Sequence, residues 1–147
     1  MDYKDLVRDF AERTRANLAL VRAAANTGQN AYEVTQLLNS MLGLLVFPEQ
    51  KFYNKIPETE LADLEKDGWP IPRVRGNYPQ VSNLSQLARY LRNGIVHFNL
   101  RFTETGGHVD GLIIWNVPPN GKKNWEAELK IEELEGITDR FTKLLLK

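Results

Sequence analysis

The spacing of apolar residues changes abruptly after Phe98, and this change limits the folds that the chain can adopt. Before Phe98, apolar residues recur every three or four positions, which is typical of amphipathic helices. From Leu100 to Ile131 they alternate with polar residues, which is typical of half-buried strands. Helical spacing returns at Glu132. We therefore expect a mainly α (α+β) fold, an antiparallel helical bundle with a three-stranded antiparallel β-meander inserted over about 99–131, before its last helix.

Turn residues and prolines set the bounds of the expected elements. The prolines and glycines of Gly68–Ser82 predict an irregular loop, after which Ser82 or Asn83 can cap a helix. The expected helices are Asp2–Ala25, Tyr32–Phe47 (ended by Pro48), Glu58–Lys66, Leu84 to about Phe98, and Glu132–Leu146. In the last strand, alternation predicts that Trp125, Ala127, Leu129 and Ile131 face one way, and Trp115 and Trp125 are expected in the core.

Length and composition exclude several classes of protein. The 147 residues suit one domain, 1–147, and the absence of cysteine excludes disulfides, thiol nucleophiles and cysteine zinc sites. The two histidines, His97 and His108, make a histidine metal site improbable, and His108 beside a glycine turn is expected at the surface. No cofactor motif is present. The longest apolar run, Met41–Phe47, is far too short for a membrane helix, so we expect a cytoplasmic protein with no membrane partner.

Positive charge is concentrated in one window. Gly68–Thr103 contains five arginines and neither lysine nor an acidic residue, so the rest of this neutral chain carries a net charge of −5. Arginine binds phosphate oxygens in a fork, and arginine among aromatic residues is typical of single-stranded nucleic-acid binding. The candidate nucleic-acid contacts are Arg73, Arg75, Arg89, Tyr90 and Arg101. Alternatively, the arginines form ion pairs with the acidic segment Glu58–Asp67.

The helix expected over 84–98 has the clearest amphipathic pattern in the chain. Its apolar side is formed by Leu84, Leu87, Ala88, Leu91, Ile95 and Phe98. Opposite them, Tyr90, Asn93 and His97 follow one another at helical spacing, with Arg92 at the flank. Gly94 lies within this helix, where glycine costs about 1 kcal/mol relative to alanine. Either the close approach of another backbone or ligand compensates for this cost, or the fold tolerates it.

The segment Arg92-Asn93-Gly94-Ile95-Val96-His97 resembles the Arg-polar-x-x-x-His signature of the HEPN superfamily (higher eukaryotes and prokaryotes nucleotide-binding domain). It lies late in the penultimate helix of the expected bundle, and an asparagine follows the arginine, as in many members. The segment 33–49 is similar to a branch of this superfamily found on plasmids and in defence regions. The resemblance covers most of the chain, but the meander departs from the minimal four-helix form of the family.

The resemblance implies a metal-independent endoribonuclease that acts as a homodimer, with two copies of the motif facing each other. His97 would act as acid or base, because imidazole titrates near neutral pH. Arg92 would stabilise the charge of the phosphorane, and Asn93 would bind the substrate or orient the imidazole. Cleavage of RNA would leave a 2′,3′-cyclic phosphate. Such an enzyme would be a toxin or antiviral effector, and an antitoxin is a possible partner.

Two other interpretations remain open from the sequence. The first is a non-catalytic module of the same fold that binds nucleotide, RNA or a partner protein such as a nucleotidyltransferase. The second is a structural helical dimer in which the Arg92–His97 spacing is a coincidence.

Overall fold

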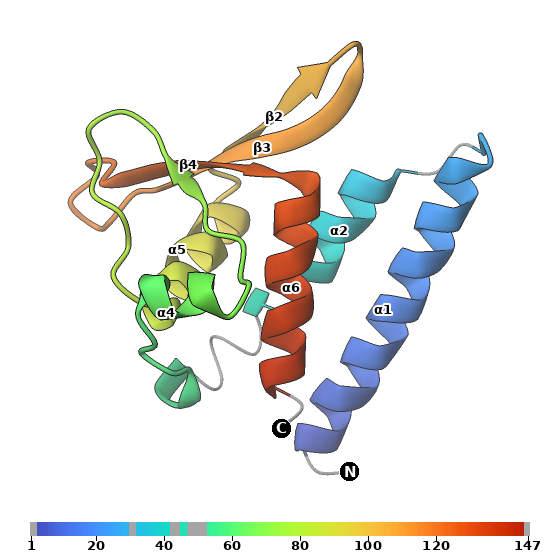
Figure 1. Ribbon diagram of the computed structural model, residues 1–147, viewed down its shortest axis with the longest axis horizontal. Coiled ribbons are helices and arrows are strands. Elements are labelled where there is room, and N and C mark those ends of the chain that lie inside the picture. Colours follow the sequence, from blue (N-terminus) through green and yellow to red (C-terminus); the bar gives the residue numbers. More distant parts are fainter. Residues whose placement is uncertain (1–2, 30–31, 42–44, 47–52, 146–147) are drawn as a thin grey trace.

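The computed structural model describes residues 3–29, 32–41, 45–46 and 53–145, and it shows a mixed fold of helices and one sheet (Figure 1). The mixed α and β composition expected from the sequence is confirmed. The elements, in chain order, are α1 (Tyr3–Asn26), α2 (Glu33–Met41), the 3-10 helix η2 (Tyr53–Lys55), α4 (Leu61–Lys66), β1 (Arg73–Val74), α5 (Leu84–Val96), β2 (Leu100–Thr105), β3 (His108–Asn116), β4 (Trp125–Lys130) and α6 (Ile131–Leu145).

The sheet has four antiparallel strands in the order β1-β4-β3-β2. Three of them, β2 to β4, follow one another in the sequence, but β1 comes from the segment Gly68–Ser82. The expectation that this segment is only an irregular loop is therefore wrong. Arg73 pairs with Glu128 and Val74 with Ala127 along the outer edge of β4. Two residues are too few to show the alternation that identifies a strand in a sequence. The segment is a strand because it pairs with the edge of β4.

The sequence predicted the start of α5 correctly. Asn83 is its N-cap, and the side-chain Oδ1 of Asn83 accepts a hydrogen bond from the backbone N–H of Gln86 at 2.9 Å. The helix packs against β3, as Figure 1 shows, and it buries Leu84, Leu87, Ala88, Leu91 and Ile95.

Gly94 lies where α5 approaches β3 most closely. A Cβ atom at this position would overlap the side chain of Ile114 and would lie 3.3 Å from the carbonyl oxygen of Trp115. Of the two explanations that the sequence left open, the structure supports a close approach, made by the Ile114 side chain and the Trp115 carbonyl of β3.

The end of α5 differs from the prediction, because the helix ends at Val96 and His97 is its C-cap. Phe98 follows in the left-handed region, with φ of 54°, and its side chain is 71% exposed. The N–H of Phe98 bonds to the carbonyl of Ile95 at 3.2 Å, and that of Asn99 bonds to Gly94 at 2.7 Å. These two bonds form a Schellman motif, which normally uses glycine at the left-handed position. Phe98 therefore lies outside the buried side of α5, contrary to the prediction.

The core lies between the sheet, α5 and α6. Trp125, Ala127 and Leu129 of β4 are fully buried, which confirms that they face inward. Ile131 is also buried, but it begins α6 instead of extending β4. Trp115 is only partly buried, and the ammonium group of Lys123 lies 4.9 Å from the centre of its ring.

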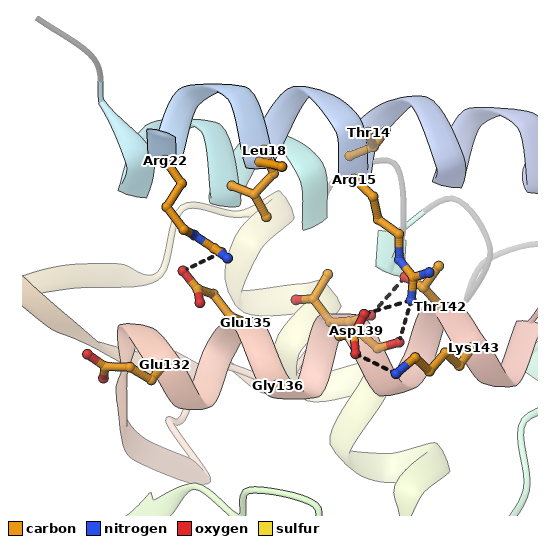
Figure 2. A pocket seen from close by; sticks show the side chains of 12 residues that line it. Thr14, Arg15, Leu18, Arg22, Glu132, Glu135, Gly136, Asp139, Thr142 and Lys143 are labelled. Atoms are coloured by element: carbon orange, nitrogen blue, oxygen red, sulfur yellow. Dashed lines mark hydrogen bonds and ion pairs between the residues drawn. The ribbon is translucent and has the colours of Figure 1, made fainter. Parts of the chain in front are cut away.

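The helices α1 and α2 lie on the side of α6 away from α5 (Figure 1). Leu37 of α2 is fully buried, and α2 packs against both α1 and α6. Ion pairs join α1 to α6 across an open cleft of about 620 Å³, with Arg15 bound to Asp139 at 2.6 Å and Arg22 bound to Glu135 at 2.7 Å (Figure 2).

Parts of three expected helices lie outside the described residues. These are Asp2 of the first, 42–44 and Phe47 of the second, and Leu146 of the last; Pro48, expected to end the second helix, also lies outside them. Leu45 and Val46 are described, and both are buried. Within the described ranges, no helix combines the length and the apolar character that crossing a bilayer requires.

Candidate functional site

The five candidate residues of the motif helix lie from the middle of α5 to its C-cap. Arg89 is exposed, Tyr90, Arg92 and Asn93 are partly buried, and His97 is exposed. Asn93 and His97 are four residues apart and share a face of the helix. The backbone N–H of His97 donates to the carbonyl oxygen of Asn93 at 3.0 Å, which fixes the backbone from which the imidazole projects.

Asn93 connects Arg92 to the sheet. The Nη2 atom of Arg92 donates to Oδ1 of Asn93 at 2.7 Å. In turn, Nδ2 of Asn93 donates to Oδ1 of Asn116 at 3.1 Å, and Asn116 is only 2% exposed. A buried amide that accepts a hydrogen bond cannot rotate without losing it, so Asn116 holds the Asn93 amide in one orientation. The guanidinium of Arg92 is thereby turned toward the helix face that Asn93 shares with His97.

The hydrogen-bond network continues beyond Asn116 to Tyr90. Asn116 Nδ2 donates to Oδ1 of Asn124 at 2.9 Å, and Asn124 Nδ2 donates to the Tyr90 hydroxyl at 3.2 Å. Gln86 Nε2 also donates to this hydroxyl, at 3.3 Å. The Tyr90 ring lies 5.5 Å from the ring of Trp125, centre to centre. Two consecutive turns of α5 are therefore tied to the β3–β4 hairpin by one series of side-chain bonds.

The sequence analysis missed Asn116 and Asn124. A signal for Asn116 was present, because it occupies the same face of β3 as Ile114, two residues earlier. A polar residue at a core-facing position of a strand requires a buried partner. Asn124 gave no such signal, since it lies in the connection between β3 and β4, where asparagine is common.

Three other candidate arginines lie on the opposite face of the sheet. Ile114 faces α5, so the adjacent row formed by Arg101, Ile113, Glu128 and Arg73 faces away from it. Arg75 joins this outer face through its ion pair with Glu126, at 3.4 Å. The structure therefore does not bring Arg73, Arg75 and Arg101 together with the motif residues of α5.

The outer face of the sheet carries mixed charge. Arg73 forms an ion pair with Glu133 at 2.8 Å, so the partners of Arg73 and Arg75 come from α6 and β4 and not from the acidic segment Glu58–Asp67. A hydrogen bond from Lys123 at 2.9 Å lowers the pKa of Glu126, and the positive charges of Arg75 and Arg101 lower it further. Glu126 is therefore ionised and offsets the arginine charge around it.

On the hairpin formed by β2 and β3, hydrogen bonds from Thr103 and Thr105 lower the pKa of Asp110. This hairpin projects away from the helices (Figure 1), and His108, near its turn, is exposed as expected. Within the described ranges of the chain, no group of three or more histidine, aspartate or glutamate side chains is placed to hold a metal ion.

A family model, described as HEPN pEK499 p136, matches residues 1–147, so the chain belongs to this HEPN family. HEPN domains are nucleotide-binding or ribonuclease-like modules, and they commonly form dimers. No curated protein and no solved structure matches the chain significantly.

Proposed function

We propose that this protein is a metal-independent endoribonuclease that acts as a homodimer. The observation that carries the proposal is the bond from Arg92 to Asn93, anchored on the buried Asn116, on a helix whose next turn ends at the exposed His97. An arginine held in place one residue before Asn93, on the same helix as an accessible imidazole, offers a group that stabilises phosphorane charge and a group that transfers a proton. Membership of a family of nucleotide-binding and ribonuclease-like modules supports the same conclusion.

The reaction is a transfer of the phosphoryl group within the RNA strand. A base removes the proton of a 2′-hydroxyl, the 2′-oxygen attacks the adjacent phosphorus, and the 5′-oxygen leaves with a proton from an acid. The products are a 2′,3′-cyclic phosphate and a free 5′-hydroxyl. His97 carries the proton, and Arg92 stabilises the additional negative charge on the phosphorane. Asn93 holds Arg92 through its side-chain oxygen, which accepts the bond from Nη2 of Arg92.

The proposed dimer provides the second proton-transfer group. One copy of α5 carries one imidazole, whereas cleavage uses both a base and an acid, so a symmetric pair of His97 residues completes the site. Val96 and Phe98 flank His97 and are 51% and 71% exposed. Burial of these apolar side chains against a second copy would favour a dimer formed around the motif.

A second candidate function is a non-catalytic module that binds RNA, nucleotide or a protein such as a nucleotidyltransferase. It is favoured by the partial burial of Arg92 and by the use of its Nη2 in the bond to Asn93. In that case Arg92 stabilises the local structure, and the exposed arginine of α5, Arg89, contributes more to binding.

The decisive test is the cleavage of mixed RNA by the purified protein in excess EDTA. We expect the wild type to leave cyclic-phosphate ends and His97→Ala to be inactive. The matched control is His108→Ala, which removes the other exposed histidine and keeps full activity. Arg92→Ala is expected to lose activity as well. Equal cleavage by wild type and His97→Ala would rule out the ribonuclease proposed here, and RNA binding without cleavage would support the second candidate.

We also propose that the chain is a single domain that acts as a toxin or defence effector, with an antitoxin as a possible partner. The span of the family match, residues 1–147, supports the single domain. Induced expression in a bacterial host tests the role: the wild type should arrest growth and degrade cellular RNA, and His97→Ala should do neither. Normal growth with an abundant, folded wild-type protein would argue against a toxin.

A further inference from the structure

An open pocket of about 650 Å³ lies beside the N-terminal half of α5, between this helix and η2. Its side chains include Tyr53 and Asn54 from η2, Glu58 from the following loop, and Gln86, Arg89 and Tyr90 from α5. This volume accommodates a nucleobase and its ribose. The pocket is polar, and its aromatic and amide groups are of the kinds that contact the faces and edges of bases.

Two of these side chains provide stacking surfaces. The guanidinium carbon of Arg89 lies 6.0 Å from the centre of the Tyr53 ring, and Tyr53 is 48% exposed. Tyrosine rings and guanidinium planes are the surfaces on which single-stranded bases stack. The Tyr90 hydroxyl and Gln86 form the wall on the side of α5, and Gln86 is held by its bonds to Ser82 and Tyr90.

The carboxylate of Glu58 makes the pocket selective. Glu58 is exposed and has two oxygen atoms side by side, both of them acceptors. Guanine has two adjacent donors, N1–H and the N2 amino group, which match a carboxylate in a paired arrangement. Adenine and cytosine have a single amino group on their Watson–Crick edge, and the N3–H of uracil lies between two carbonyl oxygens that a carboxylate repels.

We infer that this pocket binds a guanine base of the RNA, with the base stacked at Tyr53 and its N1–H and N2 edge bound to Glu58. This inference rests on the proposed function, because it assigns a specificity to the same helix. Arg89 lies four residues before Asn93, which is about 6 Å along the axis of α5. Neighbouring nucleotides of a single strand span such a distance, so one RNA strand along α5 can reach both the pocket and the motif.

The first test measures binding alone. Short uridine oligonucleotides, 2′-O-methylated so that they cannot be cleaved, carry one guanine, hypoxanthine or adenine at the centre, and fluorescence anisotropy gives their affinities. Hypoxanthine retains N1–H but lacks the amino group. We expect the wild type to bind the guanine oligonucleotide at least about tenfold more tightly than the other two, equivalent to about 1.4 kcal/mol.

Glu58→Gln should remove this preference, and Glu65→Gln should retain it. Glu65 is an exposed glutamate on α4 outside the pocket, so the two variants differ only in where the charge is lost. Tyr53→Ala should weaken binding of all three oligonucleotides, and Tyr53→Phe should not. The comparison of guanine with hypoxanthine in the wild type does not depend on the folding of any variant.

The possible outcomes separate this inference from the proposed function. Equal binding of the three oligonucleotides by the wild type, weakened by Arg92→Ala, would overturn the guanine site and leave RNA binding by the motif intact. A guanine preference that survives Glu58→Gln would also overturn it. The absence of binding to any oligonucleotide would overturn both this inference and the proposed function.

Discussion

Replacing Gly94 with alanine tests the close packing of α5 on the sheet. In the interior of a helix this substitution is normally stabilising by about 1 kcal/mol. Here the new Cβ would overlap Cγ1 and Cδ1 of Ile114, which is only 1% exposed, and would lie 3.3 Å from the Trp115 carbonyl oxygen. That carbonyl belongs to β3, which is held by β2 on one side and β4 on the other, so it cannot easily move.

The gain in helix propensity and the cost of the steric overlap together give the expected change in the free energy of unfolding. Overpacking of a core costs about 1–3 kcal/mol. Because the β3 backbone cannot easily move, we expect a cost at the upper end of this range. After the gain in helix propensity is subtracted, Gly94→Ala should lower the free energy of unfolding by about 2 kcal/mol. The measurement is urea unfolding followed by tryptophan fluorescence, with the slope of the transition compared between variants to show that the same surface unfolds.

A double variant identifies the cause. Ile114→Ala alone should cost about 2–5 kcal/mol through the cavity that it leaves. In Gly94→Ala/Ile114→Ala the added methyl group occupies part of this cavity, so the combined loss should be smaller than the sum of the two single losses. Unchanged or increased stability of Gly94→Ala would refute the reasoning, and so would strict additivity in the double variant.

Other substitutions test the network, the charged face and the end of α5. Asn116→Ala should destabilise the protein by about 2 kcal/mol, measured by urea unfolding, because it leaves the Asn93 amide without its acceptor, and RNA cleavage should fall in parallel. Glu126 has a pKa below its unfolded value, so its stabilising contribution is present above the unfolded pKa and is lost as the pH falls through the folded pKa. Glu126→Gln should therefore reduce the acid dependence of unfolding, and an identical pH profile would contradict this. Phe98→Gly should stabilise the fold by about 1 kcal/mol, because glycine adopts the left-handed conformation without strain, and a lower unfolding midpoint would argue against that strain.

Local signals predicted α5 well. Asn83 caps a run of apolar residues at helical spacing, and both features act within a few residues of one another. The sequence also predicted which side of β4 faces the core, because the alternation of Trp125, Ala127 and Leu129 depends only on the pleat of one strand. Glu132 and Glu133 mark the first turn of α6, although the helix itself begins one residue earlier, at Ile131.

The features that the sequence did not reveal depend on contacts between distant segments. β1 exists because β4, more than fifty residues later, provides an edge for Arg73 and Val74. The separation of the arginine window onto two faces of the sheet follows from the register of the strands, which composition does not encode. The left-handed conformation of Phe98 is another such case, since the chain must turn there for β2 to enter the sheet beside β3.

The anchoring of Asn93 on the β3–β4 hairpin has a consequence for the time at which activity can arise during synthesis. The ribosome makes the motif helix before it makes Asn116 and Asn124, the residues of the hairpin that continue its hydrogen-bond network. A nascent chain that ends shortly after His97 contains every residue of the motif but none of the side chains that orient it. If the chain is the ribonuclease proposed above, the motif of such a nascent chain would lack its anchor on the hairpin, and cleavage would have to await the synthesis of β3 and β4.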